Sequence, residues 1–225
     1  MNRLSFLRSI LFFSVVASTV PVFGQTAEMS SAQISAKIRA AKAFLQQLPY
    51  RSISKPETLD PATSQAKSNS VLVTEVVPPN SSRFLQTTDQ PGAFSRLEGI
   101  VVNGRSFRKV DDRPWEELTN RRLAMSPPPP PIAAVAGTSK PTVTFEYKLL
   151  ERTNLDGRDV SVFETVATVV MDGKQTEVQT TRNWISLDGL LRKVTFAKNV
   201  QGEKPLFRTT VTYEYDNIKI EVPIK

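Results

Sequence analysis

Apolar and polar residues alternate along most of the second half of the chain. This pattern is typical of antiparallel strands that bury one face and expose the other to water. The turn dipeptides Asp156-Gly157, Asp172-Gly173 and Asp188-Gly189 separate the alternating segments and indicate short connections between neighbouring strands. We therefore predict strands over residues 142–152, 159–170, 175–182, 184–187, 190–197, 206–215 and 218–222.

Shorter alternating segments in the first half predict further strands, over residues 50–54, 71–77, 82–88, 97–102 and 105–110. The last two flank Asn103-Gly104, a dipeptide that favours a two-residue hairpin turn. We expect Lys55-Pro56 to end the first of these strands, and residues 60–70 to form a polar loop. The segment 116–123 has the composition of a short helix.

A longer helix is predicted near the N-terminus, from a cap at Ser30 or Ser31 to about Leu48, with Pro49 as its stop. Its apolar residues recur at spacings of three and four, so they fall on one stripe. These residues are Ile34, Ile38, Ala41, Leu45 and Leu48. Such a stripe packs either on the body of its own protein or on a membrane surface. This one is narrow and partly alanine, which favours packing within the protein.

About ten strands with short connections predict a mainly β protein of the α+β class. A long antiparallel meander must bend into a barrel or cover its apolar face, and the amphipathic helix is the natural cover. Residues 126–141 interrupt the pattern with the run Pro127–Pro131, which is extended and cannot join a central strand. We interpret this loop as a stiff spacer between two halves of the sheet. The alternative is a ligand for an aromatic-lined groove.

Residues 1–24 have the features of a secretory signal peptide. Two arginines precede the apolar segment 10–16, and Val22 and Gly24 are small residues at the positions that a signal peptidase reads. The apolar segment is well short of the ~20 residues that span a bilayer. We expect cleavage near Gly24, a single domain over residues 25–225, and an exported, soluble, periplasmic protein.

The chain contains neither cysteine nor histidine. Their absence removes disulfides, thiolate nucleophiles, the usual general base and the commonest metal ligands. Ser52 and Lys55 fit an S-x-x-K spacing, but a strand places them on opposite faces. Asn154, Asp156 and Asp159 lack the spacing of a calcium loop and favour a hairpin turn. We therefore predict a protein that is not an enzyme and that uses no metal or cofactor. The alternative is an enzyme that uses carboxylates alone.

Basic residues outnumber acidic ones by 29 to 22, which gives a formal net charge of +7. They are spread along the predicted strands and turns, without a long basic run. This distribution does not favour nucleic acid as a partner. It is typical of a solvated surface. The alternative is attraction to anionic lipid headgroups, which implies peripheral membrane contact.

Four features follow one another along the chain. They are the N-terminal amphipathic helix, the hairpin Glu98–Lys109 followed by Trp115, the segment Trp184–Leu190, and the ending from Tyr213 to Pro223. In this order they resemble the LolA/LolB lipoprotein-carrier superfamily, with its LppX- and RseB-related members. The resemblance covers residues 28–225. It implies a LolA-like half-barrel, which is an incomplete antiparallel β-barrel around short helices, with an apolar cavity for acyl chains.

Ten apolar residues share strand faces by alternation and are the predicted lining of that cavity. They are Val143, Phe145, Tyr147, Leu149, Leu190, Val194, Phe196, Phe207, Val211 and Tyr213. A filled core is the other arrangement that these residues permit. We expect a carrier whose partner is the acyl chain of a lipid or lipoprotein. The alternative is an interaction or sensor module that docks another envelope protein through an edge strand or the proline-rich loop.

Overall fold

A computed structural model describes residues 29–60, 63, 65–68, 70–90, 93–118, 141–172, 174–200 and 207–223. The predicted signal peptide, with its cleavage position near Gly24, lies outside these residues. The proline-rich loop lies outside them as far as residue 140. Over the described residues, no helix has both the length and the apolar composition that a membrane crossing requires.

The predicted N-terminal helix is present as α1, Ser31–Phe44. Ser30 caps it: its side chain accepts a hydrogen bond from the Gln33 N–H, and the Gln33 side chain accepts one from the Ser30 N–H. This reciprocal pair satisfies two backbone donors that the first helical turn leaves free. Regular helix ends before Leu45, and irregular turns continue to Leu48.

Strands make up most of the described chain. Their bounds are β1 Tyr50–Leu59, β2 Ala66–Lys67, β3 Ser70–Val77, β4 Ser81–Gln90, β5 Ala93–Val102, β6 Arg105–Val110, β7 Glu116–Leu118, β8 Thr142–Leu155, β9 Arg158–Met171, β10 Lys174–Ser186, β11 Leu191–Val200 and β12 Phe207–Glu214. The predicted turns at Asn103-Gly104, Asp156-Gly157 and Asp188-Gly189 are present, whereas residue 173 of the predicted Asp172-Gly173 turn lies outside the described residues. Asn103 and Gly104 both have positive φ, as do Asp156 and Gly157, which is the backbone that such two-residue turns require.

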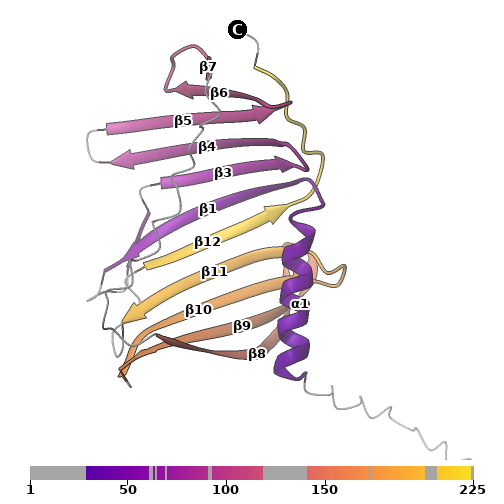
Figure 1. Cartoon of the computed structure of the whole chain (residues 1–225), viewed down its shortest axis with the longest axis vertical. Helices are drawn as coiled ribbons and strands as arrows, with labels where there is room; N and C mark the ends of the chain where they lie inside the picture. The colour runs from indigo at the N-terminus through magenta and orange to yellow at the C-terminus, as the bar shows by residue number, and fades with distance from the viewer. Residues whose placement is uncertain are drawn as a thin grey trace, which may run out of the picture.

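The strands form one antiparallel sheet in the order β7-β6-β5-β4-β3-β1-β12-β11-β10-β9-β8, with β2 paired to β1. Most neighbours are consecutive in sequence, but the two halves are joined by β1 pairing with β12. The first and last strands in this order, β7 and β8, lie at opposite ends of a twisted open sheet (Figure 1). The predicted incomplete antiparallel barrel is confirmed, although the strand order departs from a simple meander.

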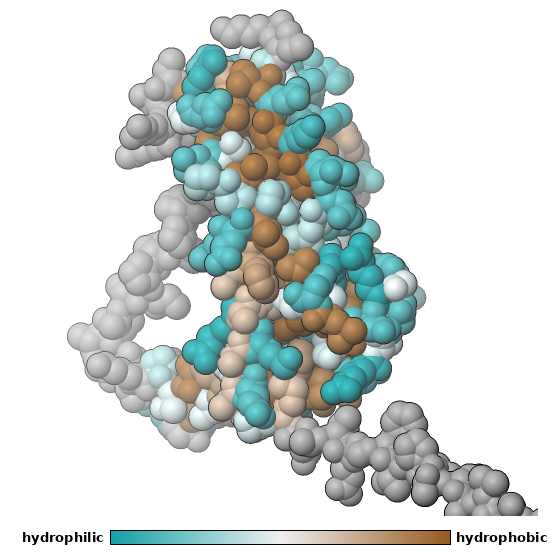
Figure 2. All heavy atoms as spheres, turned by 90° about the vertical axis from the view of Figure 1, so that its right-hand side faces the viewer, coloured by the Kyte–Doolittle hydropathy of each residue, from teal (hydrophilic) through white to brown (hydrophobic). Residues whose placement is uncertain are grey.

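Two hydrophobic clusters stabilise the two halves. The first lies between α1 and the C-terminal strands, and it contains Ile34, Ile38, Ala41, Phe163, Ile185 and Leu191. The second lies in the other half, where Ile100, Val102 and Phe107 are buried with Trp115 and Ile220 against them. Figure 2 shows hydrophobic atoms as a band between hydrophilic margins in the upper part of the molecule. Because α1 contacts β8 and β10, it covers only one end of the sheet.

The prediction that Lys55-Pro56 ends the first strand is wrong. Strand β1 runs through Pro56 to Leu59. Its pairing with β3 ends at Ser54, so Pro56 lies where β1 pairs only with β12. On its other side β1 has no partner strand at this position. A proline is tolerated at such an edge because a missing N–H on the unpaired side breaks no hydrogen bond between strands.

Two other predicted elements also differ. Residues Glu116–Leu118 form strand β7 where a helix was expected, because they pair with Ser106–Arg108, and the Arg108 guanidinium binds Glu116. The segment 218–222 is not a strand. Strand β12 ends at Glu214, opposite Arg51, near the start of β1, and the described residues beyond it, 215–223, have no strand pairing. The C-terminal segment then runs beside the strands of the first half (Figure 1).

Candidate functional site

A hollow of about 280 Å³ lies between α1 and the strands β8, β9 and β10. It is the site that best matches the predicted cavity. Helix α1 contributes Ser35, Ile38, Arg39 and Lys42, β8 contributes Phe145 and Tyr147, β9 contributes Thr165 and Ala167, and β10 contributes Gln179 and Thr181. Its volume lies just below the range of about 300–1,000 Å³ that is usual for small-molecule sites.

The strand register explains why space remains beneath the helix. Tyr147 lies opposite Thr165, which in turn lies opposite Thr181. One step along the same face, Phe145 lies opposite Ala167. Large aromatic side chains on β8 are therefore followed by small ones on β9, and the small side chains cannot fill the layer between sheet and helix. The hollow follows from this alternation of size across the sheet.

One wall of the hollow is aromatic. The rings of Phe145 and Tyr147 are stacked, with centroids 6.4 Å apart and an interplanar angle of 24°. Phe145 is nevertheless 56% exposed, so this wall opens to solvent at one end. A broad apolar surface that is only partly covered is a suitable contact for a hydrocarbon chain.

The opposite wall, on β10, is polar. Gln179 and Thr181 line the hollow, and Asn183 follows on the same face of the strand. Asn183 is only 1% exposed, and its amide nitrogen and oxygen have no hydrogen-bond partner among the described residues. A buried amide without a partner costs about 1–3 kcal/mol. The sheet face beneath α1 is therefore amphipathic, aromatic on β8 and polar on β10.

The ten residues predicted to line a cavity have different positions in the structure. Alternation and register place nine of them on the face that α1 covers, and Leu190 precedes β11 in a turn. Only Phe145 and Tyr147 line the hollow. Leu149, Val194 and Tyr213 pack against the cluster beneath α1. Val143 and Phe207 are 45% and 40% exposed, and Leu190, Phe196 and Val211 are half-buried and do not line the hollow.

Sequence reasoning missed most of the lining. Arg39 and Lys42 lie beside the apolar stripe of the predicted helix, and neither they nor the small residues of β9 and β10 carried a prediction. One sequence signal was available. Thr165, Ala167 and Thr181 occupy alternating positions where a filled core would have larger aliphatic side chains.

The aromatic hydroxyls near the centre of the sheet are poorly hydrated. Burial raises the pKa of Tyr213, and the neighbouring Tyr50 raises it further. Burial also raises the pKa of Tyr50. The two rings lie 5.9 Å apart, on β12 and at the start of β1. The face that continues from the hollow towards the middle of the sheet is therefore partly withdrawn from water.

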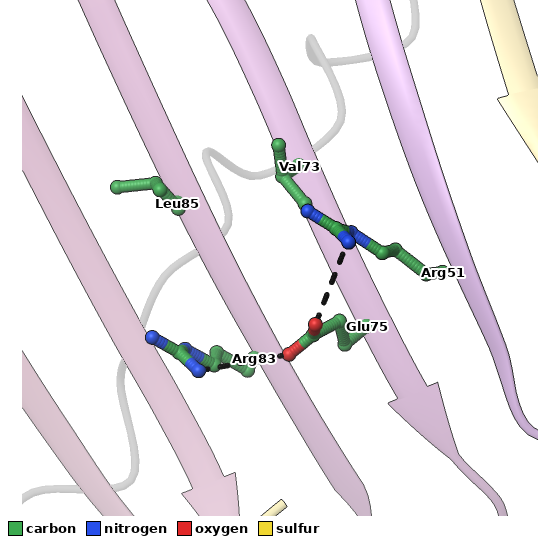
Figure 3. Close-up of a pocket in the computed structure, with 5 residues that line it drawn as sticks. All are labelled: Arg51, Val73, Glu75, Arg83 and Leu85. Carbon is green, nitrogen blue, oxygen red and sulfur yellow. Dashed lines mark ion pairs between the residues drawn. The ribbon is translucent and has the colours of Figure 1, made fainter. Parts of the chain in front are cut away.

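A second, smaller hollow of about 110 Å³ lies over β1, β3 and β4 (Figure 3). Its lining is charged. The Glu75 carboxylate lies 3.9 Å from Arg51 and 3.8 Å from Arg83, with Val73 and Leu85 alongside. The cationic groups that face it already share a carboxylate, and the space is too small for a chain of many methylenes. This hollow is therefore a weaker candidate.

The described residues contain no cluster of three or more acidic side chains positioned to hold a metal ion. The Asn154–Gly157 segment is a turn: the Asn154 side chain accepts a hydrogen bond from the Gly157 N–H. Ser52 and Lys55 are both in β1, where alternation separates them.

A scan against protein-family models finds no match for this chain. A search of curated proteins finds none either. Solved structures that are similar include the Mycobacterium tuberculosis lipoprotein LppX, at 13% identity and a TM-score of 0.40, over 85% of this chain and 100% of that one. LprF from Mycobacterium bovis is similar at 12% identity and a TM-score of 0.48, over 87% of this chain and 99% of that one.

A LolA-superfamily protein from Nitrosomonas europaea is also similar, at 13% identity and a TM-score of 0.27, over 80% of this chain and 91% of that one. Each of these likenesses concerns the fold alone.

Proposed function

We propose that this protein is an exported carrier that holds the acyl chain of a lipid or lipoprotein in the hollow beneath α1. The hollow itself carries the proposal, because a stacked aromatic wall faces a space that neighbouring side chains do not fill. Each methylene buried there contributes about 0.8 kcal/mol. Binding of this kind needs no nucleophile, metal or general base, so the function is transport or presentation of lipid and not catalysis.

The proposal includes the maturation of the chain. Residues 25–225 form a single domain that reaches the periplasm after cleavage near Gly24. The helix α1 begins only a few residues after this position, at Ser31, and it forms the roof of the hollow. Cleavage therefore leaves the lipid-binding part of the chain intact.

Native mass spectrometry of the mature protein, purified from its own envelope, tests the proposal. We expect a co-purified lipid, or uptake of added oleate or phospholipid. Ala167→Phe places a ring in the hollow and abolishes the adduct. Thr144→Phe is the matched control, because Thr144 is exposed on the other face of β8, and it leaves binding unchanged. Absence of any lipid adduct with the wild-type protein contradicts the proposal.

A second function, docking of another envelope protein, is favoured by the edge of the sheet. Strand β8 is the last in the strand order, and β9 is its neighbour. Strand β8 is long, and its residues Val143, Phe145 and Leu150 are 45%, 56% and 43% exposed. Exposed apolar edge strands are templates for pairing with another chain.

Photocrosslinking from a probe at Leu150 in intact cells distinguishes the two functions. A docking module gives a defined protein adduct that Ala167→Phe does not change, because filling the hollow leaves the edge of β8 free. A lipid carrier without a docking partner gives no protein adduct at this position, while its lipid binding is lost on the same substitution.

A further inference from the structure

The hollow beneath α1 has a cationic rim. Arg39 and Lys42 line it from the helix, and no acidic side chain does. Neither basic residue has an ion-pair partner among the described residues, whereas Arg51, Arg83 and Arg182 on the sheet are paired. The helix therefore presents two uncompensated positive charges at the site.

The acidic group nearest to the lining along β10 is already neutralised. Glu177 lies two residues before Gln179 on the same face, and the Gln179 side-chain amide donates a hydrogen bond to it. The Lys198 ammonium also binds this carboxylate, at 2.5 Å. Hydrogen bonds from Gln179 and Lys198 lower the pKa of Glu177, so its charge is held by these partners. It does not cancel the charges of Arg39 and Lys42.

The basic residues and the aromatic wall lie on different sides of one hollow. Arg39 and Lys42 flank the buried stripe of α1, next to Ile38, and the Phe145 and Tyr147 rings lie below on β8. Both basic side chains are exposed to solvent, so their charged ends stay hydrated while their stems border the hollow. A ligand that contacts both surfaces must combine a hydrocarbon chain with an anionic head.

The volume limits the number of chains. About 280 Å³ is near the smallest size of ordinary small-molecule sites, and Phe145 and Tyr147 provide one stacked pair of rings. A hollow of this size accommodates a segment of one chain better than two or three chains side by side. The head group is then held at the helix, outside the apolar part of the site.

We infer that the hollow selects single-chain anionic amphiphiles, whose carboxylate or phosphate head is bound by Arg39 and Lys42 while the chain lies on Phe145 and Tyr147. The inference rests on the proposed carrier function, and it specifies the ligand class. Attraction between exposed charges is screened by salt, so binding of such ligands weakens as ionic strength rises.

Calorimetric titration of the mature protein with oleate, oleyl alcohol and acetate tests the inference. Oleate is expected to bind up to about tenfold more tightly than the alcohol of the same chain, as two weak ion pairs permit. Arg39→Glu and Lys42→Glu are each expected to remove most of this preference, measured as the ratio of the affinities for oleate and oleyl alcohol in the same variant. Lys37→Glu is the matched control, because Lys37 is exposed on the same helix but does not line the hollow.

Lysophosphatidate in place of oleate distinguishes a phosphate head from a carboxylate, and either one supports the inference if the alcohol binds more weakly. Equal affinities for oleate and oleyl alcohol overturn the inference but leave the carrier function intact. Binding of acetate as tight as that of oleate also overturns it, because the chain then contributes nothing. If neither the acid nor the alcohol binds, the carrier function and the inference both fail.

Discussion

The Arg96 guanidinium lies 2.6 Å from the carboxylate of Glu98, two residues further along β5, and the Glu98 side chain is only 5% exposed. Arg83, on the neighbouring strand, reaches the same carboxylate at 3.3 Å. Further pairs extend this ladder of charges across the sheet, through Glu75 and Arg51 (Figure 3). The charge of the buried Glu98 carboxylate is thus compensated by two half-exposed arginines.

Removing both arginines is expected to destabilise the fold strongly. The double variant Arg83→Ala/Arg96→Ala leaves Glu98 buried without a counter-charge, which costs about 3–5 kcal/mol in free energy of unfolding. Arg108→Ala serves as the control, since its partner Glu116 is exposed and the pair contributes little. Urea denaturation measures both. Equal free energies of unfolding for the double variant and the control would show that Glu98 does not need the two arginines to compensate its charge.

Gly99 is expected to tolerate no side chain while Phe84 is present. The Phe84 ring packs over Gly99 on the facing strand, and a Cβ at position 99 would lie 2.2 Å from Phe84 Cε1. Gly99→Ala should therefore cost about 1–3 kcal/mol through overpacking. Adding Phe84→Leu should recover part of this loss, and a double-mutant cycle in urea quantifies the coupling. The explanation fails if Gly99→Ala alone is neutral.

Elements that are specified by residues close together in the sequence were predictable. The Ser30 cap and the Asn103-Gly104 turn are local chemistry, and both are present as expected. The pairing of β1 with β12 was not predictable, because it joins residues as distant as Arg51 and Glu214 and no local signal specifies it. The extension of β1 through Pro56 follows from that pairing, so it could not be predicted either.

The candidate site was predicted only in part, for a different physical reason. Bulky apolar residues are visible in a sequence, and this criterion found Phe145 and Tyr147. A cavity, however, is defined by side chains that are too small to fill it, such as Ala167 opposite Phe145. Which small residues face a large one depends on strand register, and register is known only once the strands are paired.

The cap of α1 is expected to contribute measurably to stability. Ser30→Ala removes the acceptor for the Gln33 N–H, which lies 3.3 Å from the serine oxygen, and breaks the reciprocal pair. The expected cost is about 1 kcal/mol. Ser31→Ala is the matched control, because Ser31 is the first helical residue and is not the cap. Equal urea midpoints for the two variants would contradict the role of Ser30.

The C-terminal segment should make stability fall in alkaline solution. The Tyr215 hydroxyl donates a 2.8 Å hydrogen bond to the Leu191 carbonyl. Burial raises the pKa of Tyr215 to about 12, although the nearby Arg192 guanidinium acts to lower it. A raised pKa means that the protonated hydroxyl is favoured by folding. Its stabilising contribution is therefore complete below pH 10, the usual value for tyrosine, and is lost as the pH rises through about 12.

Titration of tyrosinate absorbance, together with urea midpoints measured from pH 8 upwards, checks this expectation for Tyr215. The wild-type protein should show a tyrosine that ionises near pH 12 and a stability that declines between pH 10 and 12.

Tyr215→Phe removes the hydrogen bond to Leu191, so it should cost about 0.5–1.5 kcal/mol at neutral pH. The same variant should reduce the alkaline decline. Because burial also raises the pKa of Tyr50 and Tyr213, part of the decline persists in it. An alkaline decline of the same size in Tyr215→Phe and wild type would assign the whole effect to those two residues.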